Sequence, residues 1–139
     1  MRALADAGAT FGEQKWIDLA VTAWNFVVRE MSDGDRLYHA HRLGRNAAPG
    51  ILDDYAQMAR AGLTLYETTG NRDYLNRAIG WVSFSNDHFR DDDNGGYFFT
   101  ADDAEALITR TRTAMDNAVP AGNGVLMEVL ARLWRLTGD

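Results

Sequence analysis

Two adjacent carboxylates, Asp53 and Asp54, stand with Tyr55 at the start of an apolar segment, and these are the residues best suited to acid–base chemistry. A pair of carboxylates can divide the general-acid and general-base roles of glycoside chemistry when their surroundings differ. Neighbouring residues on a helix point about 100° apart, so at most one of the two is expected to be catalytic. The alternative is that they lie in the first helical turn and bind its unpaired N–H groups.

Two histidines, His39 and His41, alternate in "YHAHR", so a strand would direct both to one face. Such a pair could bind a metal or form the rim of a sugar-binding site. No third ligand stands near them in the sequence, so we predict no metal. We take both histidines as ligand-binding candidates at a pocket edge, and an ordinary surface position is the alternative. Arg42 and Arg45 could hold an anionic group or simply be solvated.

A long polar loop, "RTRTAMDNAVPAGNG", precedes the last apolar segment and carries Asp116 and Asn123. Loops held by a rigid scaffold often contain binding sites, so these two residues are predicted, with Tyr55, to line a ligand pocket. The alternative is that Asn123 or the backbone of the neighbouring glycines caps the helix that follows.

The acidic run from Asp91 to Asp102 fits several positions of a calcium-binding loop. Its last position lacks the bidentate glutamate, and three aromatic residues would lie inside the loop. We therefore predict a turn that leads into a β-hairpin formed by Tyr97–Thr100 and Leu107–Thr111. A shorter strand is predicted at Leu37–His41. No metal and no cofactor are predicted for this chain.

Apolar residues at helical spacing predict the elements that position these side chains. The predicted helices lie near residues 2–11, 14–31, 52–69, 73–89 and 122–137. Three glycines follow helical segments at positions that suit a left-handed C-cap, namely Gly12, Gly70 and Gly138. All four tryptophans lie in apolar stripes and are assigned to packing: Trp16, Trp24, Trp81 and Trp134.

An internal repeat organises the chain. The segment from Gly12 to Asp33 resembles the segment from Gly70 to Asp91 at an offset of about 58 residues, and "RLWRLTGD" matches "TLYETTGN". Repeats of this kind indicate a helical-hairpin array. We expect one all-α domain over residues 1–139, with one or two small β-hairpins. The array is expected to be incomplete, and its apolar edges favour self-association as a homodimer.

The composition limits the function. The chain has 139 residues, of which 46% are hydrophobic, and this excludes a disordered protein. With a net charge of −6, we expect no nucleic-acid partner, because binding to phosphates needs a basic surface. The absence of cysteine excludes disulfides and thiolate sites within these residues. No apolar run suits a membrane span or a signal peptide, so we expect no membrane association and a cytoplasmic location.

Three motifs, in this order, carry a family resemblance: "GILDDYAQMARAGLTLYETTGNRDYL", "GGYFFTADDAEALITR" and "MDNAVPAGNGV". They resemble the C-terminal domain of a thioredoxin-domain family that includes spermatogenesis-associated thioredoxin-like proteins. That domain is an (α/α)6 toroid of the six-hairpin glycosidase type, similar to N-acylglucosamine 2-epimerases. The resemblance covers nearly all of the chain and implies part of a toroid. Ala121 and Gly124 stand where the family pattern has hydroxyl residues, so no role of those hydroxyls transfers.

Two functions are expected from the resemblance and the residues together. The first is a non-catalytic structural or interaction module, and as an isolated chain we expect the protein not to be an enzyme. The alternative is a carbohydrate-binding or carbohydrate-modifying pocket of hydrolase or epimerase type, completed by a second subunit. Convergence of Asp53 or Asp54 with Tyr55, Asp116 and Asn123 on one concave surface would favour the pocket.

Overall fold

The structure, a computed structural model, describes residues 1–104 and 108–138. In this part of the chain five helices form: α1 (Arg2–Phe11), α2 (Gln14–Glu30), α3 (Leu52–Thr69), α4 (Arg72–His88) and α5 (Gly122–Thr137). A small antiparallel sheet, in the order β1-β2-β3, connects α2 to α3 and consists of β1 (Ser32–Asp33), β2 (Arg36–Arg42) and β3 (Arg45–Pro49). The predicted fold class is confirmed, and each predicted helix agrees with the observed one to within one residue at either end.

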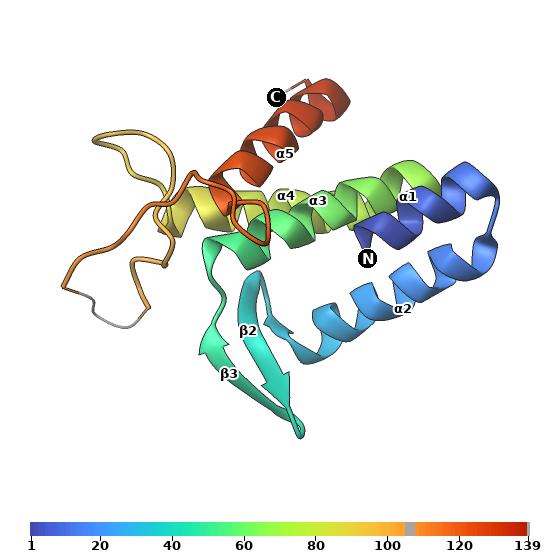
Figure 1. The fold of residues 1–139 in the computed structure, drawn as a ribbon, viewed down its shortest axis with the longest axis horizontal. Helices are drawn as coiled ribbons and strands as arrows, with labels where there is room; N and C mark the ends of the chain where they lie inside the picture. The colour runs from blue at the N-terminus through green and yellow to red at the C-terminus, as the bar shows by residue number, and fades with distance from the viewer. Residues whose placement is uncertain (105–107, 139) are drawn as a thin grey trace.

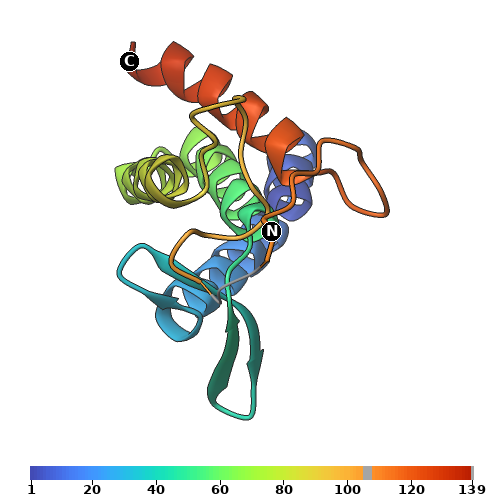
Figure 2. The ribbon, with the colours of Figure 1, turned by 90° about the vertical axis from the view of Figure 1, so that its left-hand side faces the viewer.

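Helix α3 is the centre of the fold and packs against α4, α5 and α1 (Figures 1 and 2). Its side chains Tyr55, Ala59 and Leu63 are fully buried. The Trp24 ring of α2 comes so close to Gly62 of α3 that a Cβ added at Gly62 would lie 2.7 Å from it. The apolar stripe of α3 therefore forms the middle of the core.

Glycine ends three of the helices as predicted. Gly12, Gly70 and Gly138 have φ angles of 70°, 73° and 84°, and each donates its N–H to a carbonyl four residues back. A left-handed conformation costs little only for glycine, so these positions fix where each helix stops. The two repeats thus share helix ends as well as apolar positions.

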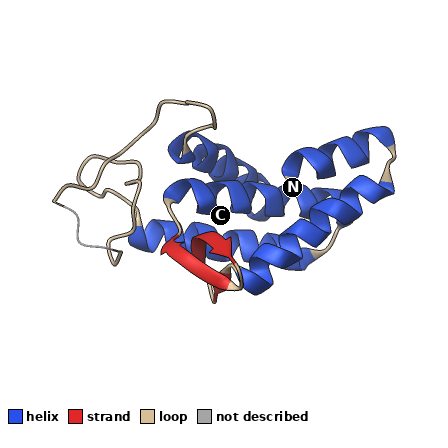
Figure 3. Cartoon of the chain, turned by 60° about the horizontal axis from the view of Figure 1, so that its bottom comes forward, coloured by secondary structure: helices blue, strands red, loops and turns tan. Residues whose placement is uncertain are grey.

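The long loop between α4 and α5 gathers at the end of the molecule where α3 and α5 begin (Figures 1 and 3). The predicted strand Tyr97–Thr100 is wrong, because Tyr97 forms only an isolated bridge with Arg90. Its predicted partner begins at Leu107, which lies outside the described residues. Arg110 explains the difference, since its guanidinium donates to the carbonyl oxygens of Thr100 (Nε–O 3.0 Å) and His88 (Nη2–O 2.8 Å). The Arg110 side chain thus takes the Thr100 carbonyl that a strand ladder would use, while the N–H of Phe99 still donates to the carbonyl of Thr111 at 2.7 Å.

The acidic run before this loop forms the predicted turn. Asp91 Oδ1 accepts hydrogen bonds from the N–H groups of Asp93 and Asn94, each at 3.1 Å. Gly95 and Gly96 follow with φ angles of 75°. The Asp91 side chain therefore stabilises the turn from within.

The assignment of all four tryptophans to packing holds for Trp24 and Trp81, which are buried with ring centroids 5.1 Å apart. Trp16 is half-buried and lies edge-on to Phe11. For Trp134 the assignment is wrong, since 65% of this residue is exposed. Helix α5 packs on α3 through its opposite side, so the Trp134 ring faces away from the core.

Within residues 1–104 and 108–138, no helix combines the length and the apolar character that crossing a bilayer requires.

Candidate functional site

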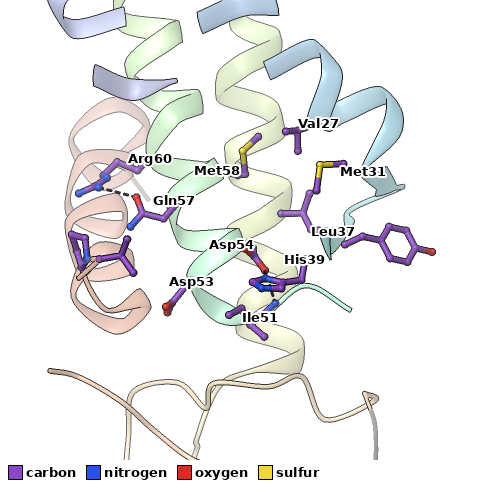
Figure 4. A pocket seen from close by; sticks show the side chains of 13 residues that line it. Val27, Met31, Leu37, His39, Ile51, Asp53, Asp54, Gln57, Met58 and Arg60 are labelled. Carbon is purple, nitrogen blue, oxygen red and sulfur yellow. Dashed lines mark hydrogen bonds and ion pairs between the residues drawn. The ribbon is translucent and has the colours of Figure 1, made fainter. Parts of the chain in front are cut away.

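A cavity of about 490 Å³ lies where the start of α3 meets β2 and α2 (Figure 4). Its apolar wall is formed by residues from α2, β2, α3 and the loop before α5: Val27, Met31, Leu37, Ile51, Met58, Val119 and Pro120. The polar groups come from α3 and β2: His39, Asp53, Asp54, Gln57 and Arg60. Tyr38 completes the lining. The cavity therefore combines an aliphatic wall with hydrogen-bonding groups.

Asp54 is held in place from two directions. Its Oδ2 accepts a hydrogen bond from the N–H of Ile51 (2.9 Å), at the cap of α3, and lies 2.8 Å from His39 Nδ1. The first contact satisfies an unpaired N–H group at the helix start, as the sequence suggested. The second contact connects α3 to β2 across the cavity wall.

Asp53 binds a different helix. Its Oδ1 accepts a hydrogen bond of 2.8 Å from the N–H of Gly122, the first residue of α5. An added Cβ on Gly122 would lie 2.5 Å from this oxygen, so the contact requires glycine. The two adjacent carboxylates thus point to different partners, as their separation around the helix predicts.

Tyr55 and His41 lie outside the cavity lining. Tyr55 is 1% exposed, and its hydroxyl accepts a hydrogen bond of 2.9 Å from the N–H of Leu37. Burial raises the pKa of the Tyr55 phenol above its ordinary value. His41 pairs instead with Asn46 across the β2–β3 hairpin (Nδ1–Oδ1 2.8 Å). Tyr55 therefore fixes β2 onto α3.

Asp116, in the loop before α5, and Asn123, in the first turn of α5, both bind backbone groups of the loop. Asp116 Oδ1 accepts a hydrogen bond from the N–H of Ala121 at 2.9 Å, just before α5. Asn123 accepts from the N–H of Tyr97 and donates to the carbonyl oxygens of Tyr97 and Thr113, each at 2.9 Å. Of the predicted site residues, the structure brings Asp53, Asp54 and His39 to one cavity, without Tyr55, Asp116 or Asn123.

Sequence reasoning missed Gln57 and Arg60. They follow Asp53 by four and seven residues, a spacing that places all three on one helix face. Arg60 donates to Gln57 Oε1 (Nη2–Oε1 2.8 Å) and to Glu128 Oε2 on α5 (Nη1–Oε2 3.2 Å). The helical spacing from Asp53 was therefore the signal that could have found them.

A second cluster of titratable groups lies where α4, β2 and the loop after α4 meet. His88 Nδ1 lies 2.8 Å from Asp102 Oδ1 and 3.7 Å from Asp103 Oδ2. Arg36 forms a two-pronged ion pair with Asp103, and this hydrogen bonding lowers the pKa of the Asp103 carboxyl. These groups could surround a cation, but they already satisfy one another. We interpret them as an ion-pair network that joins α4, β2 and the loop.

No family model matches the chain. It is 31% identical over 145 residues to spermatogenesis-associated protein 20 of Rattus norvegicus and to that of Homo sapiens, alignments that cover 96% of this chain. An uncharacterized protein of Caenorhabditis elegans is 27% identical over 130 residues. The chain spans 18% of the length of each of these relatives.

Among solved structures, the fold is similar to the crystal structure of a family 76 glycoside hydrolase from a bovine Bacteroides thetaiotaomicron strain. The TM-score is 0.76 at 15% identity, over 98% of this chain and 29% of that one. Identity at this level shows the fold, an α/α toroid, and not the activity. Together these findings make the chain a homologue of a segment of spermatogenesis-associated protein 20, folded as part of an α/α toroid.

Proposed function

We propose that the cavity at the start of α3 binds a carbohydrate and that the chain acts as a non-catalytic binding module. The observation that supports this most is the position of Asp53, Asp54 and His39 on one cavity of about 490 Å³. Small-molecule sites usually have volumes of about 300–1,000 Å³, with an apolar lining and a few polar groups. A cavity of this size has room for one or two sugar units.

The lining suits a polyol. Carboxylate oxygens accept hydrogen bonds from hydroxyl groups, and the amide of Gln57 can both donate and accept. The aliphatic side chains of Met31 and Met58 offer contact to the C–H face of a sugar ring. The similar solved structure is a glycoside hydrolase, which supports carbohydrate as the ligand class.

The contacts of the two carboxylates favour binding over bond cleavage. Glycoside hydrolysis needs two carboxyl groups on either side of the scissile bond, about 5–9.5 Å apart. Here Asp53 is directed to the start of α5 and Asp54 to the cap of α3 and to His39. Each has one oxygen fixed as an acceptor, an arrangement that suits recognition of hydroxyl groups.

The proposal is tested by titrating the protein with glucose, mannose, N-acetylglucosamine and their disaccharides in a calorimeter. We expect binding that weakens about tenfold or more in Asp54→Asn, because a hydrogen bond to a charged group contributes about 1.5–3 kcal/mol. Asp73→Asn is the matched control, since Asp73 also lies in the first turn of a helix but outside the cavity.

Two results would contradict the proposal. One is the absence of heat with every sugar in the panel, and the other is equal affinity in Asp54→Asn and the wild type. Release of nitrophenol from nitrophenyl glycosides, lost in Asp53→Asn or Asp54→Asn, would instead support the carbohydrate-modifying alternative with one of these residues as the catalytic group.

A further inference from the structure

The cavity at the start of α3 has an excess of acidic side chains. Two carboxylates line it, those of Asp53 and Asp54, against one guanidinium, that of Arg60. The guanidinium already has a partner, because Arg60 Nη1 lies 3.2 Å from Glu128 Oε2 on α5. The charge of the two aspartates therefore decides which ligands the cavity favours.

The two carboxylates differ in their partners (Figure 4). Asp54 Oδ2 lies 2.8 Å from His39 Nδ1 and accepts the N–H of Ile51 at 2.9 Å. Asp53 Oδ1 accepts the N–H of Gly122 at 2.8 Å, and within the described part of the chain no basic side chain forms an ion pair with Asp53. Its second oxygen, Oδ2, accepts no hydrogen bond from any described residue. Asp53 is thus the acidic group of the cavity whose charge has no side-chain counterpart.

The helix ends offset only part of this charge. Asp54 caps the start of α3, and Asp53 binds the first residue of α5. Each helix start carries a partial positive charge of about half an elementary charge, so the two together offset about one of the two carboxylates. About one negative charge remains beside a wall that is otherwise aliphatic. Such a site favours a ligand that carries one positive charge.

We propose that the cavity selects an amino sugar, with the ammonium group of the ligand at Asp53 Oδ2 and its hydroxyl groups at Asp54 and Gln57. This inference rests on the carbohydrate proposal above and adds the charge of the ligand. An ammonium group has three donors and no acceptor, so it suits a carboxylate oxygen that no other donor occupies. A sugar acid is disfavoured, because its carboxylate would lie near those of the two aspartates.

Calorimetric titration with four sugars of the same ring skeleton tests the charge preference: glucosamine, glucose, N-acetylglucosamine and glucuronic acid. At pH 7 an amino group of this type is mostly protonated. We expect glucosamine to bind about tenfold more tightly than glucose or N-acetylglucosamine, and glucuronic acid to bind most weakly. The preference for glucosamine should shrink in about 1 M salt, because salt screens charge.

Asp53→Asn tests the assignment of the ammonium group. The amide keeps an oxygen for the N–H of Gly122 and loses the charge. We expect the ratio of the glucosamine affinity to the glucose affinity to fall to about one in this variant. Asp73→Asn is the matched control, since Asp73 lies in the first turn of α4 and outside the cavity, and it should keep the wild-type ratio.

The outcomes separate this inference from the proposed function. Equal affinity of the wild type for glucosamine and glucose would overturn the charge preference and leave carbohydrate binding intact. A preference for glucosamine that survives Asp53→Asn would overturn the assignment to Asp53. The absence of binding with all four sugars would overturn both proposals. The wild-type comparison needs no variant, so it decides the charge preference even if Asp53→Asn does not fold.

Discussion

Gly122 is the residue at which the site depends most on the absence of a side chain. We expect Gly122→Ala to destabilise the protein by about 1–3 kcal/mol, because the added methyl group would meet Asp53 Oδ1 at 2.5 Å and Leu52 Cγ at 2.9 Å. Urea unfolding followed by circular dichroism measures the change. Gly124→Ala is the control two residues along α5, where an added Cβ meets nothing within 4 Å. That variant should be stabilised by about 0.5–1 kcal/mol, and the same sign in both would contradict the prediction.

Tyr55 connects the site helix to the sheet through its hydroxyl. We expect Tyr55→Phe to lower the free energy of unfolding by about 1–3 kcal/mol, since the buried N–H of Leu37 would lose its acceptor. The ring itself would keep its stacking on Phe84, at a centroid distance of 4.9 Å. Tyr66→Phe, at a half-buried position of the same helix, is the control and should change stability by less than about 0.5 kcal/mol. Equal unfolding midpoints in both variants would show that the hydroxyl contributes nothing.

At the residue scale, the sequence predicted the side chains of the cavity in part. Asp53 and Asp54 could be placed in a first helical turn from residue type and position alone. Their partners could not be predicted, because Gly122 and His39 reach them through the packing of α5 and β2 on α3. Asn123 shows the same limit, since its contact with Tyr97 joins segments that no local pattern relates.

Among the elements, the β2–β3 hairpin carries a strained turn. Leu43 and Gly44 connect the strands with φ angles of 51° and 71°. Two-residue hairpin turns of this kind favour asparagine followed by glycine, because asparagine tolerates a positive φ better than leucine does. Leu43 is 90% exposed, so its side chain adds little packing.

We therefore expect Leu43→Asn to slow hydrogen exchange at the amides of β2 and β3. The expected change corresponds to about 1 kcal/mol in the free energy of local opening. Leu43→Ala separates the two causes, since alanine removes the exposed side chain and keeps the unfavourable φ. That variant should exchange as the wild type does. If both variants slow exchange equally, loss of the leucine side chain would be the cause instead of the turn.

The helices were predictable because independent signals agree: apolar spacing and the internal repeat, with a glycine at the C-cap of α1, α3 and α5. The segment after α4 lacks that agreement. Its apolar and β-branched residues suggested a strand, but the carbonyl of Thr100 is bound by the Arg110 side chain. Such contacts depend on how distant segments meet, and residue patterns do not encode them.

For the molecule as a whole, α3 connects the cavity to the other helices of the fold. Its start forms the cavity with β2, and its middle packs against α5, whose outer face remains exposed. Arg60 joins the cavity to α5 directly, since it lines the cavity and binds Glu128 on α5.

The pH dependence of folding is a property of the whole core. Burial raises the pKa of Tyr55, Tyr74 and Tyr97, so all three phenols stay neutral in the folded protein at a pH where the unfolded chain ionises. Above a pH of about 10 the unfolded state therefore binds fewer protons than the folded state, and stability falls as pH rises. The stabilisation that comes from the three neutral phenols is fully present below that pH. It is lost as the pH rises through their raised pKa values in the folded protein. Urea midpoints measured from about pH 8 upward should fall beyond pH 10, with a shallower slope in Tyr55→Phe than in the wild type. A constant midpoint, or an equal slope in that variant, would contradict the coupling between burial and ionisation.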